Sequence, residues 1–283
     1  MSTRIRYLGV AAYEITGPKH RILMDPFLTG SAVAPCGPDD LATPDVILVS
    51  HPPLDHLGDA AAIAIRTGAP VVCGADSKAL LLERGVPAAQ IRHSIWGIKV
   101  LIGEDLLIRP VECHHWAGAT LADGRIVPGW PLGFVVETEP GVRVYHFGDS
   151  AVFGDMRLIG ELHAPTVGLL GCSQPYALLP QTYAGAGRIV TGEMSPEEAA
   201  LAAEFLGVRY AVATHYYDPD SDDVRSFLAE VPKRDTTGRR VPLALRPDQT
   251  LVIDGDSYRV EDPPTGQLGS IDRAPQPAMR TRA

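Results

Sequence analysis

The sequence predicts an α/β protein in which two sheets pack face to face with helices outside them, a four-layer αββα sandwich. Two observations predict this fold. Short strand patterns fill the first half of the chain, and both halves also carry helix patterns with clear start and stop signals. The 283 residues are 45% hydrophobic and 21% charged, which is enough apolar material for one large core.

The first half begins with three strand patterns, at residues 5–8, 12–15 and 22–24, and the turn residues between them predict a meander. The continuous apolar run at residues 46–49 predicts a strand that is buried on both faces. An Ala-rich helix is expected at residues 57–67, with Gly at position 68 ending it. Further strands are expected at residues 71–73, 100–111, 134–137 and 142–147, with a short helix at 77–84.

The second half repeats a strand followed by a helix. A strand is expected at residues 166–170, and the segment SPEEAALAAEFLG then predicts a helix. Ser195 suits its N-cap, Pro196 its first position, and Gly207 the position past its end. After it we expect a strand at residues 210–213, a helix at 222–231, and a closing hairpin of strands 243–245 and 251–253.

These elements indicate one domain over residues 1–260, with an inserted loop at about residues 174–191. A connection between a strand and a helix usually takes roughly 2–6 residues, so this loop is unusually long. Its aromatic and apolar residues favour a loop that lines a pocket or a subunit interface. Residues 261–283 are polar, with Pro, Gly and Arg and no periodicity, and predict a disordered C-terminal tail.

Composition excludes several classes of function. The net charge of −9 and the pI of about 5.4 argue against nucleic acid as a partner, because phosphate binding needs a basic surface. No apolar run approaches the roughly 18 residues of a membrane span, and the N-terminus shows no signal peptide. The four cysteines are widely spread and form no CxxC pair. We therefore expect reduced thiols and a cytoplasmic location.

Residues that bind metals follow four predicted strands. They are His51, Asp55 and His56 in SHPPLDHLGD, His114 and His115 in ECHHWAG, Asp149 in YHFGDS, and His215 in ATHYYD. Because each group lies just beyond the end of a strand, the side chains can converge at one edge of the sandwich. Imidazole and carboxylate ligands together suit zinc, and manganese or iron could also fit. A lone histidine after a strand is more often an ordinary loop residue, but four such groups together indicate a metal site.

These motifs, in this order, resemble those of the metallo-β-lactamase superfamily. The chain most resembles its branch of small cytosolic metal-dependent hydrolases related to ascorbate-phosphate lactonases. The segments ILMDPFLTG and MSPEEAALAAEFLGVRYAVATHY also match that branch, so the resemblance spans about residues 3–255. It implies the metallo-β-lactamase fold and hydrolysis by water that a metal ion activates.

The resemblance implies one metal held by Asp55, His56 and His215, with Asp149 bridging to a second metal. The second metal would take the two histidines of the HxH part of the HxHxDH motif. Here His51 supplies the first of them, and Pro53 stands where the second is expected.

The last ligand of the second metal would be His114, with His115 as a substitute. A further departure is that no histidine occurs near Gly9, where the branch usually has one. We therefore expect one or two zinc ions per chain.

Other residues are expected to support the reaction. Asp25 in LMDPF can accept the free N–H of a metal-bound imidazole, although an Asx turn before proline would explain it equally well. Asp55 and Asp149 can orient the reacting water and take its proton. Trp116, Tyr183, Tyr216 and Tyr217 are candidates to line a substrate pocket, and each could instead pack in the core.

The expected function is zinc-dependent hydrolysis of a small molecule: a lactone, ester, amide or activated ether. Pro53 motivates an alternative, a metal-poor, non-catalytic subunit that partners an active paralogue in a hetero-oligomer. A redox enzyme that uses iron and oxygen is a further alternative. We expect a homo-oligomer or a hetero-oligomer with a paralogue, and no nucleic-acid or membrane partner.

Overall fold

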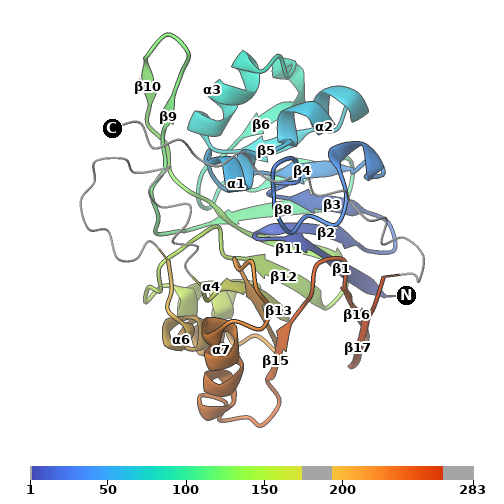
Figure 1. Ribbon diagram of the computed structural model, residues 1–283, viewed down its shortest axis with the longest axis vertical. Helices are drawn as coiled ribbons and strands as arrows, with labels where there is room; N and C mark the ends of the chain where they lie inside the picture. The colour runs from blue at the N-terminus through green and yellow to red at the C-terminus, as the bar shows by residue number, and fades with distance from the viewer. Residues whose placement is uncertain (1, 174–192, 264–283) are drawn as a thin grey trace.

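A computed structural model describes residues 2–173 and 193–263 of the chain. Two sheets lie face to face in the middle of the molecule, and helices cover the outer face of each (Figure 1). This arrangement confirms the α/β class and the layering predicted from the sequence.

The first sheet has eight strands among the described residues. In spatial order they are β17 (Ser257–Glu261), β16 (Thr250–Asp254), β1 (Thr3–Gly9), β2 (Ala12–Thr16), β3 (Arg21–Met24), β4 (Val46–Leu48), β5 (Val71–Cys73) and β6 (Ile91–His93). Strands β1, β2 and β3 form the expected antiparallel meander. Strands β3 to β6 run parallel.

The second sheet has seven strands in the described part of the chain. They are β15 (Val241–Ala244), β14 (Tyr210–Thr214), β13 (Val167–Gly171), β12 (Val142–His146), β11 (Gly133–Glu139), β8 (Leu106–Val111) and β7 (Val100–Ile102). Strands β12 to β15 run parallel, and β11, β8 and β7 complete the sheet with antiparallel pairings. A small separate hairpin pairs β9 (Ala119–Thr120) with β10 (Ile126–Val127).

Helices lie on the two outer faces (Figure 1). They are α1 (Leu54–Leu57), α2 (Ala60–Thr67), α3 (Ala75–Glu83), α4 (Met156–His163), α6 (Pro196–Leu206) and α7 (Asp222–Lys233), with 3₁₀ turns η1 (Pro38–Asp40) and η2 (Ala88–Gln90). Helices α2 and α3 pack on the first sheet through a cluster that includes Ile63, Leu81 and Val71. Helices α4, α6 and α7 cover the second sheet (Figure 1).

The main core lies between the sheets. Ile5, Tyr13 and Val46 of the first sheet and Phe134 and Val144 of the second belong to one cluster of almost wholly buried side chains. Burying each such side chain contributes roughly 1.5–3 kcal/mol to folding. This core fixes the position of one sheet relative to the other. It therefore also fixes where the loops at the ends of their strands begin.

The helix expected at residues 57–67 is interrupted. Helix α1 ends at Leu57, and α2 begins only at Ala60. At Gly58 the backbone turns with φ 34°, and a Cβ there would collide with the carbonyl of Pro26. The Asp59 carboxylate then accepts the N–H of Leu28 and of residue 29. The loop after β3 is therefore fastened against the turn that carries Asp55 and His56.

The expected closing hairpin is wrong. Strand β15 joins β14 in the second sheet, whereas β16 pairs with β1 in the first, so the chain crosses between sheets at this point. A further strand, β17, pairs with β16 and was not expected. The apolar pattern predicts where strands occur, but the partner of each strand depends on contacts with residues that are distant in sequence.

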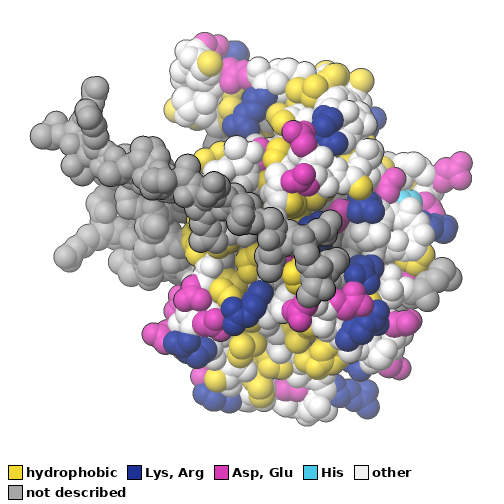
Figure 2. All heavy atoms as spheres, turned by 45° about the vertical axis from the view of Figure 1, so that its right-hand side comes forward, with side chains coloured by type: hydrophobic (Ala, Val, Ile, Leu, Met, Phe, Trp, Pro, Cys, Tyr) yellow, Lys and Arg dark blue, Asp and Glu magenta, His cyan; other side chains and the backbone are white. Residues whose placement is uncertain are grey.

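Other expectations concern the surface and the ends of the chain. No helix among the described residues is long and apolar enough to cross a membrane. On the face shown in Figure 2, acidic and basic side chains are interspersed, without a single basic patch. The four cysteines are free thiols. The inserted loop at residues 174–191 lies outside the described residues, and so does the tail beyond residue 263.

Candidate metal centre

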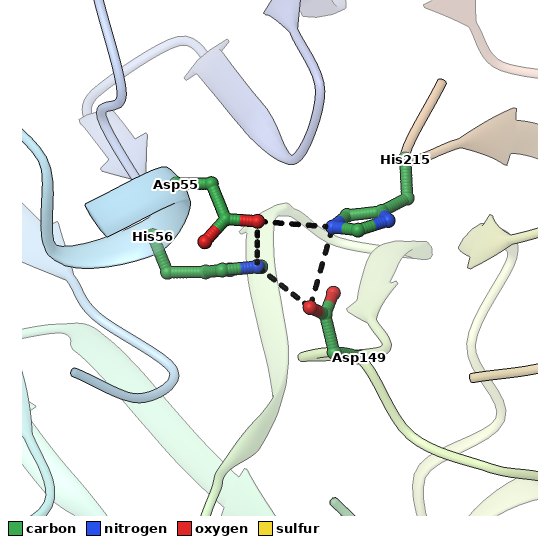
Figure 3. A group of neighbouring side chains, drawn as sticks. All are labelled: Asp55, His56, Asp149 and His215. Atoms are coloured by element: carbon green, nitrogen blue, oxygen red, sulfur yellow. Dashed lines mark ion pairs between the residues drawn. The ribbon is translucent and has the colours of Figure 1, made fainter. Parts of the chain in front are cut away.

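The candidate metal ligands follow the ends of strands, as the sequence predicts. The loop after β4 leads to Asp55 and His56 on α1, Asp149 follows β12, and His215 follows β14 directly. Strand β4 belongs to the first sheet, whereas β12 and β14 belong to the second. The loops that follow these strands meet at one edge of the sandwich. Figure 3 shows the four side chains pointing toward one another.

These four residues form a compact group, called here the four-residue cluster. Their ligand atoms all lie within 4.8 Å of one another. Oδ2 of Asp149 is 2.8 Å from Nε2 of His56 and 3.3 Å from Nε2 of His215. Oδ2 of Asp55 is 3.5 Å from Nε2 of His215 and 3.7 Å from Nε2 of His56. The arrangement offers two nitrogen and two oxygen ligands to one ion.

A second group, the three-residue cluster, consists of His51, His115 and Asp149. The Asp149 carboxylate belongs to both clusters, and its Oδ2 is 3.8 Å from Nε2 of His51. The rings of His51 and His115 meet edge to face with their centroids 5.0 Å apart. Pro53 occupies the N-cap of α1 and has no side-chain donor, so this cluster has one fewer histidine than the HxHxDH pattern would give it.

The structure places His115, and not His114, beside His51 and Asp149. The His114 side chain is 47% exposed, with Nε2 2.8 Å from Oε1 of Glu112, and its ring stacks on Phe153. The two neighbouring side chains therefore lie in different surroundings, and only that of His115 belongs to the cluster. The sequence could not decide between them, because the strand β8 ends before the pair and the loop has no regular pattern.

Asp25 occupies the position expected of an orienting carboxylate. Its Oδ2 is 2.8 Å from Nδ1 of His56, and the Ser50 hydroxyl donates to the same oxygen at 2.6 Å. Because the Ser50 hydroxyl donates its hydrogen to Asp25, its Oγ can only accept a hydrogen bond from Nδ1 of His51, which is 2.9 Å away. Asp25 thus orients His56 directly and His51 through Ser50, and both rings turn Nε2 toward Asp149.

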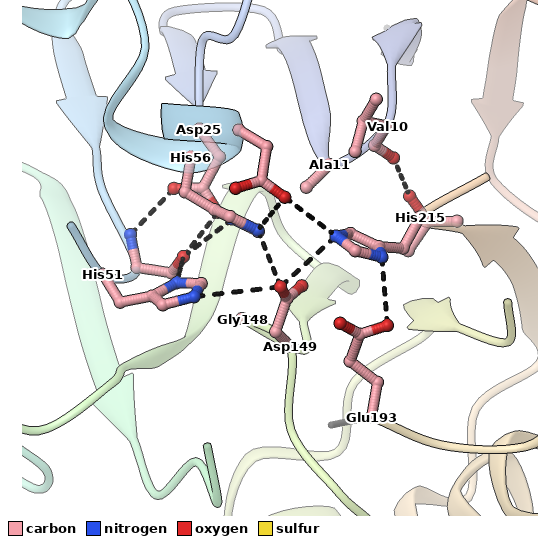
Figure 4. A network of polar contacts seen from close by, with 12 residues as sticks. Val10, Ala11, Asp25, His51, His56, Gly148, Asp149, Glu193 and His215 are labelled. Atoms are coloured by element: carbon pink, nitrogen blue, oxygen red, sulfur yellow. Dashed lines mark hydrogen bonds and ion pairs between the residues drawn. The ribbon is translucent and has the colours of Figure 1, made fainter. Parts of the chain in front are cut away.

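Glu193 is a site residue that the sequence analysis missed. Its carboxylate lies 3.1 Å from Nδ1 of His215, and the residue is 9% exposed (Figure 4). It places a negative charge beside Nδ1 of His215, as Asp25 does beside Nδ1 of His56, but only Asp25 forms a hydrogen bond to its imidazole. Only its position two residues before the helix N-cap Ser195 could have pointed to it, and a glutamate there is usually read as part of the helix start.

The backbone around the site is strained. Of six non-glycine residues with positive φ in the described part of the chain, four belong here: Val10, Asp25, Asp149 and His215. A β-branched residue such as Val10 rarely adopts this conformation. Its carbonyl accepts the N–H of His215 at 2.9 Å and the hydroxyl of Thr214 at 2.8 Å (Figure 4). Strain of about 1–3 kcal/mol per residue persists where the surroundings enforce it, and it is frequent at functional sites.

The electrostatics of the four-residue cluster are those of carboxylates gathered around imidazoles. Burial alone lowers the pKa of His56, but the carboxylates of Asp149, Asp25 and Asp55 outweigh it and hold that pKa well above its usual value. His215 behaves in the same way, with Asp149 and Glu193 raising its pKa. Burial raises the pKa of Asp149, but His215 and His56 hold it well below its ordinary range. The site therefore favours positive charge.

His51 differs. Burial lowers its pKa well below the ordinary value, and the neighbouring His56 lowers it further. Its imidazole is therefore neutral at physiological pH, which is the form that binds a metal.

These residues fit a metal ion. The Nε2 atoms of His51, His56 and His215 are buried and form no hydrogen bond within the described residues. All three point toward the Asp149 carboxylate (Figure 4). A buried polar atom without a hydrogen bond is costly, and metal ions held by the two clusters would satisfy these nitrogens. Mixed nitrogen and oxygen ligands suit zinc, manganese or iron.

The expected pocket residues lie in different surroundings. Trp116 is 45% exposed, and its ring centroid is 5.8 Å from that of His115, so it stands beside the three-residue cluster. Tyr216 is buried, packs on Tyr7 and donates its hydroxyl to the Leu245 carbonyl, which makes it a core residue. Tyr183 lies outside the described residues.

Tyr217, two residues after His215, is half-buried. Burial raises the pKa of its hydroxyl, and the nearby Asp55 carboxylate raises it further. Tyr217 is therefore close enough to Asp55 to feel its charge, whereas Tyr216 packs in the core.

Comparisons with known proteins agree with this geometry. The pattern of the beta-lactamase superfamily domain matches residues 20–216. A UPF0173 metal-dependent hydrolase of Rubrobacter xylanophilus is 38% identical over 221 residues, which cover 76% of this chain and 81% of that protein. One of Methanopyrus kandleri is 34% identical over 258 residues, with 90% and 99% covered. Among solved structures, Igni18, a metallo hydrolase of Ignicoccus hospitalis, superposes with a TM-score of 0.70 at 25% identity, with 90% and 99% covered.

Proposed function

Because the chain belongs to the beta-lactamase superfamily and is a metal-dependent hydrolase, we propose that it uses zinc to hydrolyse a small molecule. The bond cleaved would be that of a lactone, ester, amide or activated ether. The four-residue cluster is the observation that carries this proposal, because its four ligand atoms lie close together in a largely buried site.

A zinc ion in such a site supplies a Lewis acid and lowers the pKa of water to about 7. The residues of the chain divide the remaining work. Asp149 joins the two clusters, and Asp25 and Glu193 fix the imidazoles of His56 and His215.

Asp55 is the most accessible member of the four-residue cluster. Its side chain is 15% exposed, against 0–3% for His56, His215 and Asp149. Burial raises the pKa of Asp55, but His56 and His215 lower it to below its ordinary value. The carboxylate is therefore ionised and open to incoming molecules, so it can orient the attacking water and accept its proton.

The test is elemental analysis of the purified, undialysed protein, followed by assays on lactones, aryl esters and amides. We expect one to two zinc per chain and hydrolysis that a chelator abolishes and zinc restores. The variant His215→Ala should be inactive, whereas His93→Ala, at an exposed position at the end of β6, should match the wild type. Absence of metal uptake, or full activity of His215→Ala, would refute the proposal.

Pro53 supports a second candidate, a metal-poor subunit that partners an active paralogue. It leaves the three-residue cluster with two histidines and one shared carboxylate. Metal uptake by the isolated chain decides between the candidates, because a non-catalytic subunit would bind no ion tightly and would co-purify with its paralogue.

We also propose that the protein forms a homo-oligomer, or a hetero-oligomer with a paralogue, in the cytoplasm. The free thiols of all four cysteines support a reducing compartment. Light scattering of the pure chain tests the oligomer, and a monomer at micromolar concentration would contradict it. Fractionation of the source cells tests the location.

A further inference from the structure

Asp76, outside both clusters, has a buried carboxylate whose partners lead back to the metal centre. It lies in the first turn of α3 and is wholly buried. Its Oδ1 accepts the N–H of Ser77, and its Oδ2 accepts the N–H of Gly118, each at 2.8 Å. Burying a carboxylate this deeply costs solvation free energy, which hydrogen bonds from the protein must offset.

The Asp76 carboxylate contacts both ends of the β9–β10 hairpin. Gly118 directly precedes β9, and Gly129 follows β10 by two residues. A Cβ at Gly129 would collide with the Asp76 carboxylate, so the returning strand also passes against it. In Figure 1 the hairpin rises beside α3. Farther out, Glu83 at the other end of α3 accepts the N–H of Ala122 at 3.0 Å.

His115 lies between two anchors. On one side, the His114 N–H donates to the Ser150 hydroxyl at 2.9 Å, and the His114 carbonyl accepts the N–H of Ala151 at 3.0 Å. On the other side, Gly118 is held by Asp76. The stretch from residue 112 to 118 has no helix or strand, so these anchors, more than any ladder of backbone hydrogen bonds, set the direction of the His115 ring.

We propose that Asp76 is a positioning residue that holds His115 in place as a ligand of the three-residue cluster. The inference rests on the proposed metal-dependent function. With Pro53 in place of a histidine, that cluster has only three ligand residues, one of them shared. Its affinity therefore depends on how well His115 is held, and Asp76 controls this from α3 without touching the ion.

The test is titration of the metal-free protein with cobalt(II), followed by visible absorption and calorimetry. His115→Ala identifies the binding event of the three-residue cluster. Asp76→Ala should weaken that event tenfold or more, because partners that orient ligands typically contribute about 10–100-fold in affinity. It should leave the event of the four-residue cluster within twofold. The matched control Glu83→Gln, on the same helix and hairpin, should change neither event.

A double-variant cycle separates positioning from general damage. If Asp76 acts through His115, then Asp76→Ala should have no further effect on cobalt affinity in the His115→Ala background. An equal loss in both backgrounds, or equal weakening of both binding events, would overturn the inference. If Asp76→Ala does not fold by circular dichroism, Asp76→Asn replaces it, and the same cycle applies.

Failure of this inference can be told from failure of the hydrolase proposal. A single cobalt event that His115→Ala leaves unchanged would overturn the role of Asp76 alone, because the four-residue cluster suffices for one ion. No cobalt uptake at all would overturn both.

Discussion

At the scale of single residues, the two clusters are unequal. The four-residue cluster has two carboxylates and two imidazoles, and each imidazole has a further carboxylate beside its Nδ1. The three-residue cluster shares Asp149 with it, and His51 reaches Asp25 only through Ser50. The stronger site should therefore be the one that contains His215.

This inequality predicts different losses of metal. His215→Ala or Asp55→Ala should remove the tightly held ion, whereas His51→Ala should reduce metal content and leave about one ion per chain. Elemental analysis after gel filtration in chelated buffer measures both, with His93→Ala as the control. Equal losses in all three variants would show that the clusters are equivalent.

Glu193 gives a second prediction. Replacing it by glutamine keeps the size of the side chain but removes the negative charge beside Nδ1 of His215. Zinc affinity should fall roughly 10–100-fold, as for other carboxylates that orient a metal-bound imidazole. Competition with a chromophoric chelator measures it. Glu197→Gln, four residues on at an exposed position, is the control, and an unchanged affinity in Glu193→Gln would remove Glu193 from the site.

The pKa shifts predict how the stability of the metal-free protein depends on pH. His56 and His215 have folded pKa values well above their unfolded value of about 6.5. Their stabilisation is complete below that value and is lost as the pH rises through the folded pKa values. The pKa of His51 is lowered, so it affects stability only below about pH 6.5, and with the opposite sign.

Thermal unfolding of the metal-free protein should therefore show falling stability from pH 7 to pH 9. Asp25→Asn removes one of the carboxylates that raise the pKa of His56, so its slope should be shallower. Saturating zinc should suppress the slope in the wild type, because the metal replaces the protons. Rising stability of the metal-free protein over this range would contradict the assignment.

At the scale of secondary-structure elements, local sequence signals predicted the ends of helix α6 well but predicted poorly which strands pair with each other. Helix α6 begins and ends where SPEEAALAAEFLG predicts, because its capping box and terminal glycine act within a few residues. The pairing of β15 and β16 with strands of different sheets depends on distant residues. The break between α1 and α2 likewise arises from the loop packed against Gly58.

The cap of α6 predicts a measurable contribution to stability. The Ser195 hydroxyl accepts the N–H of Glu198, and the Glu198 carboxylate accepts the N–H of Ser195. Ser195→Ala should lower the free energy of unfolding by about 1 kcal/mol. Urea denaturation with metal bound measures it, and Ser226→Ala, inside α7, should cost little or nothing. Equal effects of the two changes would mean that the cap contributes nothing specific.

At the scale of the whole molecule, the sequence predicted where the site lies better than how it is held. His51, Asp55, His56, Asp149 and His215 meet because their strands end at one edge, which the strand patterns indicate. The choice of His115 over His114, the partner Glu193 and the strained backbone at Val10 arise from packing between segments that are far apart in sequence. No local pattern encodes them.

The centre also gathers charge that the fold alone leaves unbalanced. Asp25, Asp149 and Glu193 are at most 9% exposed, and Asp55 adjoins them. Burying several carboxylates together is costly, since each raises the pKa of the next. Two protonated imidazoles offset part of that charge in the metal-free protein, and divalent ions would offset it more fully. Metal binding should therefore stabilise the whole fold.

Zinc at 100 times its dissociation constant should add about 2.7 kcal/mol to the free energy of unfolding for each site occupied. For a protein of this size, each kcal/mol raises the melting temperature by roughly 2 °C. Differential scanning calorimetry with zinc and with a chelator measures the shift. His215→Ala should lose most of it, whereas His51→Ala should keep the larger part, because the four-residue cluster contains His215 and not His51. A shift that His215→Ala leaves intact would mean that zinc stabilises the protein at some other place.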